Sequence, residues 1–302
     1  MGKSYNLLFR FNWIIYLLII GALSSCETFD PVEEAPSFIR VDDFTFSTTS
    51  TQGDASHRIE DVWVSIGTEF IGVFPIPSTI PLIAKGNKTI SIAPGIRLNG
   101  ISSARLAYPY YVAHEVSVNL IPDSVIPIVP EFGYSNSADF ALIEDFEEIG
   151  IKLVATANSY AEIERTDNPL IAFHGQSAKL SLQEEELKFE CKSNVYYNLP
   201  GLGNPVILEF NYKSNHSLVV GTFIILPDPT PANPNQLKAL QQPVITLNPT
   251  DEWKRIYVSL IEQVSGNPTN LGIEPFFGFV RGNGVEGELT VYLDNIKLVY
   301  SR

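Results

Sequence analysis

The sequence predicts an all-β protein with two β-sandwich domains, and three observations support this fold class. Apolar and polar residues alternate in short runs such as residues 62–66, 206–213 and 255–260. A period of two is typical of a strand that turns one face to a core and the other toward water. The 21 prolines and 20 glycines fall mostly between these runs, where turns are needed. Helical periodicity is weak outside the first 25 residues, apart from a turn around residues 235–240, so an α/β enzyme fold is not expected.

Residues 1–25 have the order of a secretory signal peptide. Lys3 and Arg10 give a basic start, residues 11–22 are almost wholly apolar, and small residues follow directly before Cys26. The apolar run is shorter than the roughly 20 residues that a membrane-spanning helix needs. We therefore expect this segment to be removed from the mature chain.

The four residues LSSC that end at Cys26 resemble the lipobox of bacterial lipoproteins. The resemblance implies cleavage just before Cys26, a diacylglycerol on its sulfur and an acylated amino end, so that lipid anchors the mature chain to a membrane. Two or more acyl chains suffice for stable attachment, because each buried methylene group contributes about 0.8 kcal/mol. A plain secreted chain and an uncleaved anchoring helix are the alternatives.

Residues 26–36 form an acidic, proline-bearing segment that we interpret as an extended tether. Its carboxylates belong to Glu27, Asp30, Glu33 and Glu34. They resemble the acidic residues that follow the lipidated cysteine in surface lipoproteins of the Bacteroidota type. The resemblance implies an outer-membrane protein displayed on the cell surface, with a periplasm-facing position as the alternative.

Charge and cysteine content narrow the function further. The net charge of −14 argues against nucleic-acid binding, which needs lysine and arginine gathered on one face. With Cys26 lipidated, only Cys191 remains, so no disulfide can form within the chain. Cys191 lies in LKFECK, where apolar and charged residues alternate. This pattern predicts a buried strand cysteine rather than a reactive thiol.

Residues 37–135 are predicted to form the smaller sandwich, because the turn-rich stretch 130–140 separates two sets of strands. The glycines and prolines that punctuate residues 61–100 resemble those of small transthyretin-like modules of the carboxypeptidase-regulatory and PEGA kind. The resemblance implies an immunoglobulin- or transthyretin-like sandwich that serves as a spacer or interaction domain. The tyrosines of YPYY, residues 108–111, are expected either to form an exposed platform or to cover one end of this sandwich.

Residues 138–302 contain five landmarks in order. These are an acidic element in ALIEDFEE, a glycine in FHGQSAKLSL, a lysine–serine pair in LEFNYKS, Trp253 before a long strand, and an Asp-Asn turn in LTVYLDNIKLVY. The order resembles the jelly-roll, galactose-binding-like sandwiches that include many carbohydrate-binding modules. The resemblance implies a roll whose first and last strands are neighbours.

This arrangement predicts a site for a structural calcium ion. If the first and last strands are neighbours, Glu147 and Asp294 can meet at one end of the roll, with Asp145 in reserve. Carboxylates and backbone carbonyls are the hard oxygen ligands that Ca²⁺ prefers. The resemblance implies carbonyl ligands near residues 175–177. Alternatively, Asp294 only forms a turn with Asn295. No catalytic cofactor is expected.

Two adjacent aromatic pairs are the candidates for sugar binding, namely Tyr196 with Tyr197 and Phe276 with Phe277. Neighbouring residues of a strand point to opposite faces, so one ring of each pair is expected to point outward. Stacking of such rings on pyranose faces is the sugar-binding mode that the resemblance implies. Purely structural use of the outward rings is the alternative.

Catalysis is not expected from this sequence. The four histidines lack metal-ligand spacing such as HExxH, and no GxSxG, phosphate-binding loop or CxxC is present. We therefore expect a non-catalytic surface lipoprotein whose jelly roll binds carbohydrate. The alternative is a structural, assembly or adhesin lipoprotein that binds a protein partner in an outer-membrane complex. Exposed rings would favour the glycan, whereas an unpaired sheet edge or flat apolar patch would favour the protein.

Overall fold

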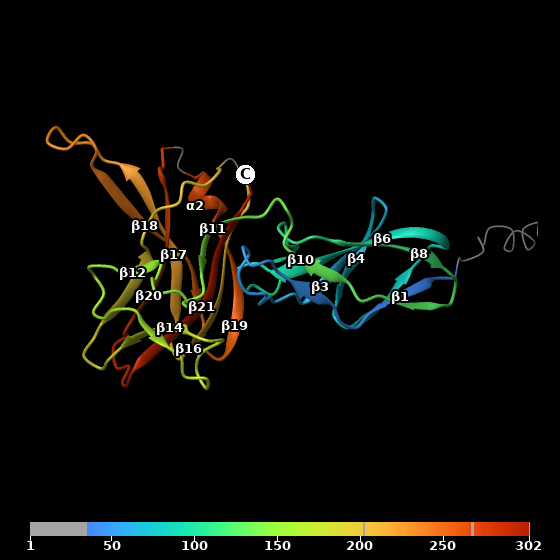
Figure 1. The fold of residues 1–302 in the computed structure, drawn as a ribbon, viewed down its shortest axis with the longest axis horizontal. Coiled ribbons are helices and arrows are strands. Elements are labelled where there is room, and N and C mark those ends of the chain that lie inside the picture. The colour runs from blue at the N-terminus through green and yellow to red at the C-terminus, as the bar shows by residue number, and fades with distance from the viewer. Residues whose placement is uncertain (1–34, 202, 267–268, 302) are drawn as a thin grey trace, which may run out of the picture.

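The computed structural model describes residues 35–201, 203–266 and 269–301. The predicted signal peptide, the lipidation site Cys26 and residues 26–34 of the tether lie outside the described residues. No helix in the described part of the chain is long and apolar enough to span a membrane. Figure 1 shows two bodies built of strands, arranged one after the other along the long axis.

The N-terminal sandwich packs a five-stranded sheet and a three-stranded sheet around one core. The larger sheet contains β4 (Glu69–Pro75), β3 (Asp61–Ile66), β6 (Gly86–Arg97), β7 (Arg105–Ala107) and β8 (His114–Leu120). The smaller sheet contains β5 (Ser78–Leu82), β1 (Ser37–Val41) and β9 (Val125–Pro127), and β2 (Thr45–Ser47) pairs with β10 (Glu131–Gly133). Alternation buries Val62 and Val64 of β3 against Ile39 and Val41 of β1 in the shared core.

The C-terminal body also has two sheets around its own core. One contains β13 (Glu164–Thr166), β14 (Ser177–Leu182), β21 (Leu289–Tyr300), β16 (Val206–Ser214) and β19 (Thr250–Ser259), with β11 (Asp139–Glu144) also paired to β21. The other contains β12 (Leu153–Ala155), β15 (Lys188–Ser193), β20 (Gly272–Val280), β17 (Leu218–Pro227) and β18 (Leu237–Leu247).

The strand pairing of the C-terminal body is that of a jelly roll. Four antiparallel pairs are nested within one another along the chain, namely β14 with β21, β15 with β20, β16 with β19 and β17 with β18. Such nesting is what results when one long hairpin is rolled up so that successive pairs alternate between two sheets. The first strand, β11, pairs with the last, β21. The predicted all-β fold class is therefore confirmed, and so is the neighbourhood of the first and last strands.

The strands predicted in residues 62–66, 206–213 and 255–260 are confirmed, and they correspond to β3, β16 and β19. Cys191 is fully buried in β15, as predicted. Residues 237–247, however, belong to the long strand β18, so the helical turn expected around residues 235–240 is wrong. Pairing with β17 along the whole length of β18 outweighs the weak local preference of this segment. The short helix α2 (Ile261–Ser265) was not foreseen.

The two bodies share a buried junction. The junction tyrosines Tyr108, Tyr110, Tyr111 and Tyr134 are all buried, and they pack at the end of the N-terminal sandwich that meets the jelly roll. The N-terminal core continues onto Ile207, Tyr257 and Val299 of the jelly roll. Of the two expectations for YPYY, the structure therefore supports covering of the sandwich end and not an exposed platform.

Charged groups are buried inside this junction. Arg255 donates to Oε2 of Glu209 at 2.5 Å, Tyr134 donates to the same oxygen at 2.6 Å, and Tyr108 donates to Oε1. Lys297 of the jelly roll donates to the backbone oxygen of Asp54 at 2.6 Å. Because buried polar groups must keep their partners, these contacts tie the two bodies into one unit.

Candidate functional site

The outer face of the sheet β12–β15–β20–β17–β18 carries a network of charged and amide side chains. On β15, Phe189 and Cys191 point into the core, so Lys188, Glu190 and Lys192 point outward. By register, Lys192 lies beside Phe276 of β20, and Glu274 of β20 lies beside Phe223 of β17. Gln241 of β18 lies beside Phe223 in turn. Charged, amide and aromatic side chains thus alternate across four strands.

This face is concave. Gln241 of β18 donates to Oε2 of Glu190 on β15 at 2.7 Å, although β17 and β20 lie between the two strands. Three inter-strand spacings of about 4.8 Å would separate the two backbones by about 14 Å on a flat sheet. Two side chains of ordinary length close that gap only if the sheet curls toward this face. The long hairpin of β17 and β18 projects from the roll, as Figure 1 shows.

Glu190 is the centre of the polar network. Its carboxylate accepts hydrogen bonds from Thr156 at 2.8 Å and Gln241 at 2.7 Å, and pairs with Lys188 at 2.9 Å. Burial acts to raise the pKa of Glu190, but these hydrogen bonds favour the charged form more strongly and hold the pKa below its usual value. Glu190 is therefore an ionised acceptor at neutral pH. Nearby, Lys192 pairs with Glu274 at 2.5 Å, and both members lie mostly out of water.

Aromatic rings border the network at both ends. Phe223 lies under the Lys192 ammonium, 5.9 Å from Nζ to the ring centroid. Tyr196 is 45% exposed, and its ring lies against Gly272, the residue of β20 on the same face as Glu274. Tyr160 is 56% exposed and lines an open hollow of about 640 Å³ with Lys188, whose backbone oxygen accepts from the Tyr160 N–H at 2.9 Å. The concave face thus offers charged hydrogen-bonding groups between two accessible rings.

The four predicted sugar-binding residues differ in their exposure to solvent. Tyr196 is exposed, as a sugar-binding ring must be. Tyr197 packs against the core, and burial raises its pKa to about 12, with the Glu144 charge acting in the same direction. The expectation that Phe276 or Phe277 presents a ring to solvent is wrong, since their exposed fractions are 1% and 0%.

The burial of both phenylalanines has a structural cause. Phe277 points into the core against Phe210, with ring centroids 5.1 Å apart. Phe276 does point to the outer face, but the Phe223 ring packs on it, with ring centroids 5.2 Å apart. An outward position in a strand is therefore not an exposed position when the sheet is concave.

Sequence reasoning missed the polar half of this face. The signal was present, because LKFECK sends three charged side chains to the side opposite a buried cysteine. Charge alternation on a strand normally indicates a solvated face, so it did not distinguish a ligand site from ordinary surface. The partners Glu274 and Gln241 come from strands far along the chain, and no local pattern links them to Glu190.

The expected calcium ligands lie around one pocket. Asp145, Glu147 and Asp294 line a pocket of about 310 Å³ together with Asp54 of the N-terminal sandwich. Ser177 donates to Asp294 at 2.5 Å, and the backbone N–H of Gln176 donates to Glu147 at 2.6 Å. The roll therefore brings these carboxylates together, as its topology predicts.

The donor chemistry of this pocket suits Ca²⁺, but its present geometry is not that of a formed metal site. Within the described ranges, no group of three or more His, Cys, Asp or Glu residues is arranged to hold a metal ion. Asp294 also accepts from the backbone N–H of Asn295, but both residues lie inside β21, where the register shifts and Asn295 has a φ of 48°, so the expected Asp-Asn turn is instead a β-bulge within the strand. Burial raises the pKa of Asp294 to about 7, with the charges of Glu147 and Asp54 acting in the same direction.

Comparison with known proteins gives distant structural likenesses. No family model matches the sequence, and no curated protein is significantly similar to it. One similar solved structure concerns carbohydrate-binding modules of the β-sandwich superfamily; it is 14% identical, covers 89% of this chain and 99% of its own, and has a TM-score of 0.36. A xylan-binding domain from Paenibacillus barcinonensis is 10% identical over 56% of this chain and 98% of its own, with a TM-score of 0.34.

A third similar structure is the family 11 carbohydrate-binding module of a cellulosomal cellulase from Clostridium thermocellum. It is 12% identical, covers 54% of this chain and 95% of its own, and has a TM-score of 0.33. These structural neighbours are carbohydrate-binding modules. Likenesses this distant do not decide a ligand, so the proposal below rests on the geometry of the concave face.

Proposed function

We propose that this chain is a non-catalytic, lipid-anchored surface protein that binds carbohydrate on the concave face of its jelly roll. The observation that carries the proposal is the row of charged groups between Tyr160 and Tyr196, with Glu190 held ionised at its centre. Sugars need two kinds of contact, and this face offers both. Hydroxyl groups pair with carboxylate, amide and ammonium groups, and the apolar faces of the sugar ring pack on aromatic rings.

The lipid anchor is a separate part of the proposal. It rests on the signal-peptide pattern and the lipobox resemblance that end at Cys26, outside the described residues. The acidic residues after Cys26 support display at the cell surface of the outer membrane. In this arrangement the N-terminal sandwich is the spacer, and the jelly roll carries the binding face.

Binding is tested with the whole chain from residue 27 onward, because removal of the N-terminal sandwich would expose the buried junction. A glycan array identifies a ligand, and calorimetry with that ligand compares the parent protein with Glu274→Gln and Tyr196→Ala. Loss of a hydrogen bond to a charged group costs about 1.5–3 kcal/mol, which corresponds to roughly 10- to 150-fold weaker binding. We expect Glu274→Gln to fall in this range and Tyr196→Ala to bind clearly more weakly.

The matched control is Lys179→Met on the other sheet of the roll. Lys179 forms a salt bridge with Glu288 at 2.8 Å, as Glu274 does with Lys192 at 2.5 Å, but Lys179 lies in the other sheet, away from the concave face. We expect its affinity to be unchanged. An array without any bound glycan, or equal affinity in the parent and both concave-face variants, would remove the proposal.

A protein partner is the second candidate function, and one feature favours it. Among the described strands, β18 pairs with β17 alone and forms the edge of its sheet, and it exposes Leu237 and Leu240. An unpaired edge of this kind can receive a strand from another protein. If the full chain in the cell envelope carries a photo-crosslinking residue at position 240, that residue would then capture a protein. The same residue at position 196 would not.

A structural calcium ion at Asp145, Glu147 and Asp294 also stays a proposal. The shared acidic pocket supports it, and the absence of a formed ligand group among the described residues means that the carboxylates would have to converge on binding. Bound calcium should raise the melting temperature, and a chelator should reverse the increase. A melting temperature that responds to neither would exclude the ion.

A further inference from the structure

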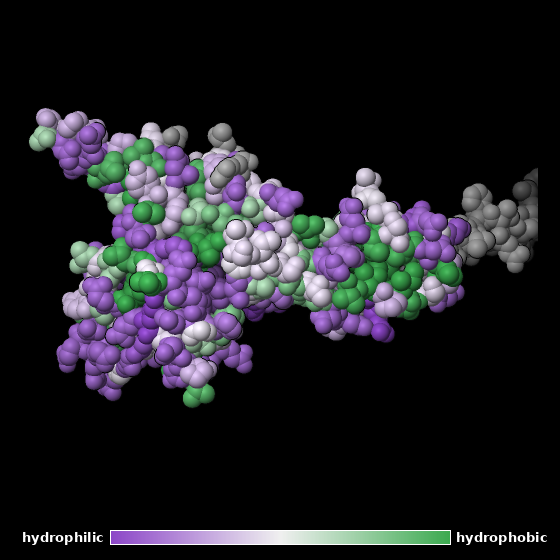
Figure 2. Space-filling model, in the orientation of Figure 1, coloured by the Kyte–Doolittle hydropathy of each residue, from purple (hydrophilic) through white to green (hydrophobic). Residues whose placement is uncertain are grey.

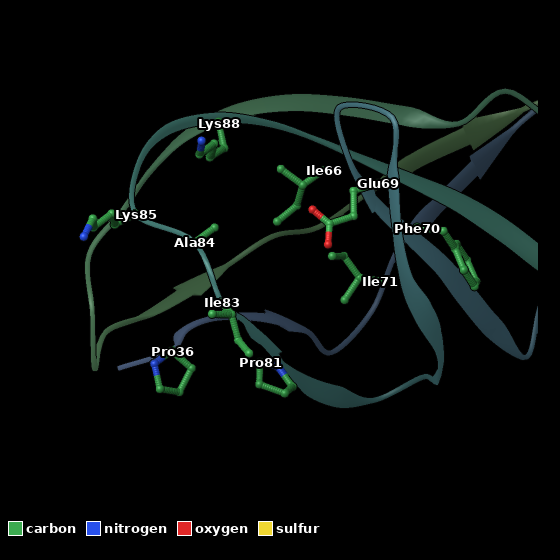
Figure 3. A pocket seen from close by; sticks show the side chains of 10 residues that line it. All are labelled: Pro36, Ile66, Glu69, Phe70, Ile71, Pro81, Ile83, Ala84, Lys85 and Lys88. Atoms are coloured by element: carbon green, nitrogen blue, oxygen red, sulfur yellow. The ribbon is translucent and has the colours of Figure 1, made fainter. Parts of the chain in front are cut away.

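The N-terminal sandwich has a hollow at the end farthest from the jelly roll. Figure 3 shows Ile66, Glu69 and Ile71 on one side of it and Pro36, Pro81 and Ile83 on the other. Its volume is about 730 Å³, and Lys85 and Lys88 stand at the rim. Most of the lining is apolar, which is unusual for a surface that no other described part of the chain covers.

Exposed apolar side chains gather around this hollow. Phe70 and Ile83 line it and are 55% and 77% exposed. Ile121 is 55% exposed and belongs to the turn whose Asp123 donates to the backbone oxygen of Pro36. We call Phe70, Ile83 and Ile121 the end patch. Figure 2 shows hydrophobic surface over this body up to the end where the described chain begins.

The position of the chain start relates the end patch to the lipid. Pro36 lines the hollow itself and follows Cys26 by only ten positions in the chain. A chain of ten residues spans at most about 33–36 Å when fully extended. A lipid on Cys26 would therefore keep the end patch within that distance of the bilayer, while the jelly roll lies at the opposite end of the long axis.

We propose that the end patch contacts the lipid bilayer and sets the chain upright on the membrane. The inference rests on the proposed lipid at Cys26 and adds a second, non-covalent contact. Apolar side chains drive it, because the net charge of −14 does not favour attraction to anionic lipid. Lys85 and Lys88 at the rim lie at headgroup level, which suits lysines beside an inserted apolar group.

This orientation has a consequence for ligand binding. With the end patch on the bilayer, the rigid junction holds the jelly roll away from the membrane along the long axis. The concave face then stays accessible to large ligands outside the cell. Without the contact, the lipid on Cys26 alone would not fix the orientation of the two bodies.

The test uses the lipidated full chain in phosphatidylcholine vesicles that contain nitroxide-labelled acyl chains. An environment-sensitive fluorophore is attached in Ile83→Cys and, as the matched control, in Leu170→Cys, an exposed apolar position of the jelly roll. Cys191 is fully buried and does not compete for the label. We expect several-fold stronger quenching at position 83 than at position 170, unchanged at high salt. Phe70→Ser with Ile121→Ser should remove most of this difference, and circular dichroism checks that the variant folds.

Two results with the lipidated chain would overturn the proposal. One is equal, weak quenching at both positions in a chain whose Cys26 lipid is confirmed by mass spectrometry. The other is a label at position 83 that is shielded from a water-soluble quencher but not quenched by lipid, since a second copy would then cover the patch. If mass spectrometry finds no lipid on Cys26, anchoring fails separately. Unlipidated chain mixed with excess vesicles then decides the contact, and absence of quenching there refutes it.

Discussion

Replacement of Arg255 with methionine is expected to destabilise the whole two-body unit. The Arg255 and Glu209 side chains are 1% and 0% exposed, and the substitution leaves the Glu209 carboxylate buried without its cation. Removing one partner of a buried ion pair typically costs about 3–5 kcal/mol. Tyr108 and Tyr134 still donate to the carboxylate, and they offset part of this loss.

Lys297 offsets a further part. Burial lowers the pKa of Lys297 to about 7, and the Arg255 charge acts in the same direction. Without Arg255 the ammonium form of Lys297 is more favourable, so a positive charge remains near Glu209. We therefore expect a loss near the lower limit, about 3 kcal/mol, or a melting temperature lower by roughly 6–12 °C for a unit of this size.

Urea unfolding and calorimetry at pH 7 measure this effect in the chain from residue 27 onward. The control is Arg40→Met, because Arg40 and Asp42 form an exposed pair at 2.8 Å with side chains 52% and 56% exposed. Exposed pairs are worth about 0–1 kcal/mol. The double variant Arg255→Met with Glu209→Leu should recover much of the stability by removing both charges. Equal, small losses in Arg255→Met and Arg40→Met would refute the reasoning.

Three further predictions concern the junction and the concave face. Burial is the largest cause that raises the pKa of all four junction tyrosines. Above pH ~10 the unfolded state therefore binds fewer protons than the folded state, so the free energy of unfolding should fall steeply with pH. Melting curves between pH 9 and 11 measure this fall. The pKa of Lys297 is lowered to about 7, so between pH 7 and 9 the unfolded state binds more protons than the folded state. The free energy of unfolding should therefore rise by about 2 kcal/mol from pH 7 to pH 9. Urea unfolding of Lys297→Met should lack this rise. Gly221→Ala should lower the free energy of unfolding in urea by about 1–3 kcal/mol, because the new Cβ would clash with the Gln242 carbonyl oxygen and the Phe276 ring. A variant as stable as the parent would contradict this packing.

Strands could be predicted from the sequence, but only part of the candidate site could. Alternation in LKFECK correctly predicts that Cys191 is buried, because the direction of a side chain in a strand depends only on its position along the chain. The same rule predicted that one ring of the pair Phe276 and Phe277 points outward, as Phe276 does, but it did not predict that the sheet curls and that Phe223 packs on this ring. Curvature depends on neighbouring strands, which no local pattern describes.

The junction separates the two levels of information most clearly. The period of two placed Glu209 and Asn211 on the face of β16 opposite the core, and that face looked like one turned toward water. In the structure both are buried, because Tyr108, 101 residues earlier in the chain, packs on this face from the other sandwich. The sequence by itself therefore determined the all-β class and the two faces of each strand, since both follow from local periodicity. Only the tertiary structure decided which face meets water, another domain or a ligand, because burial arises from contacts between segments far apart in the chain.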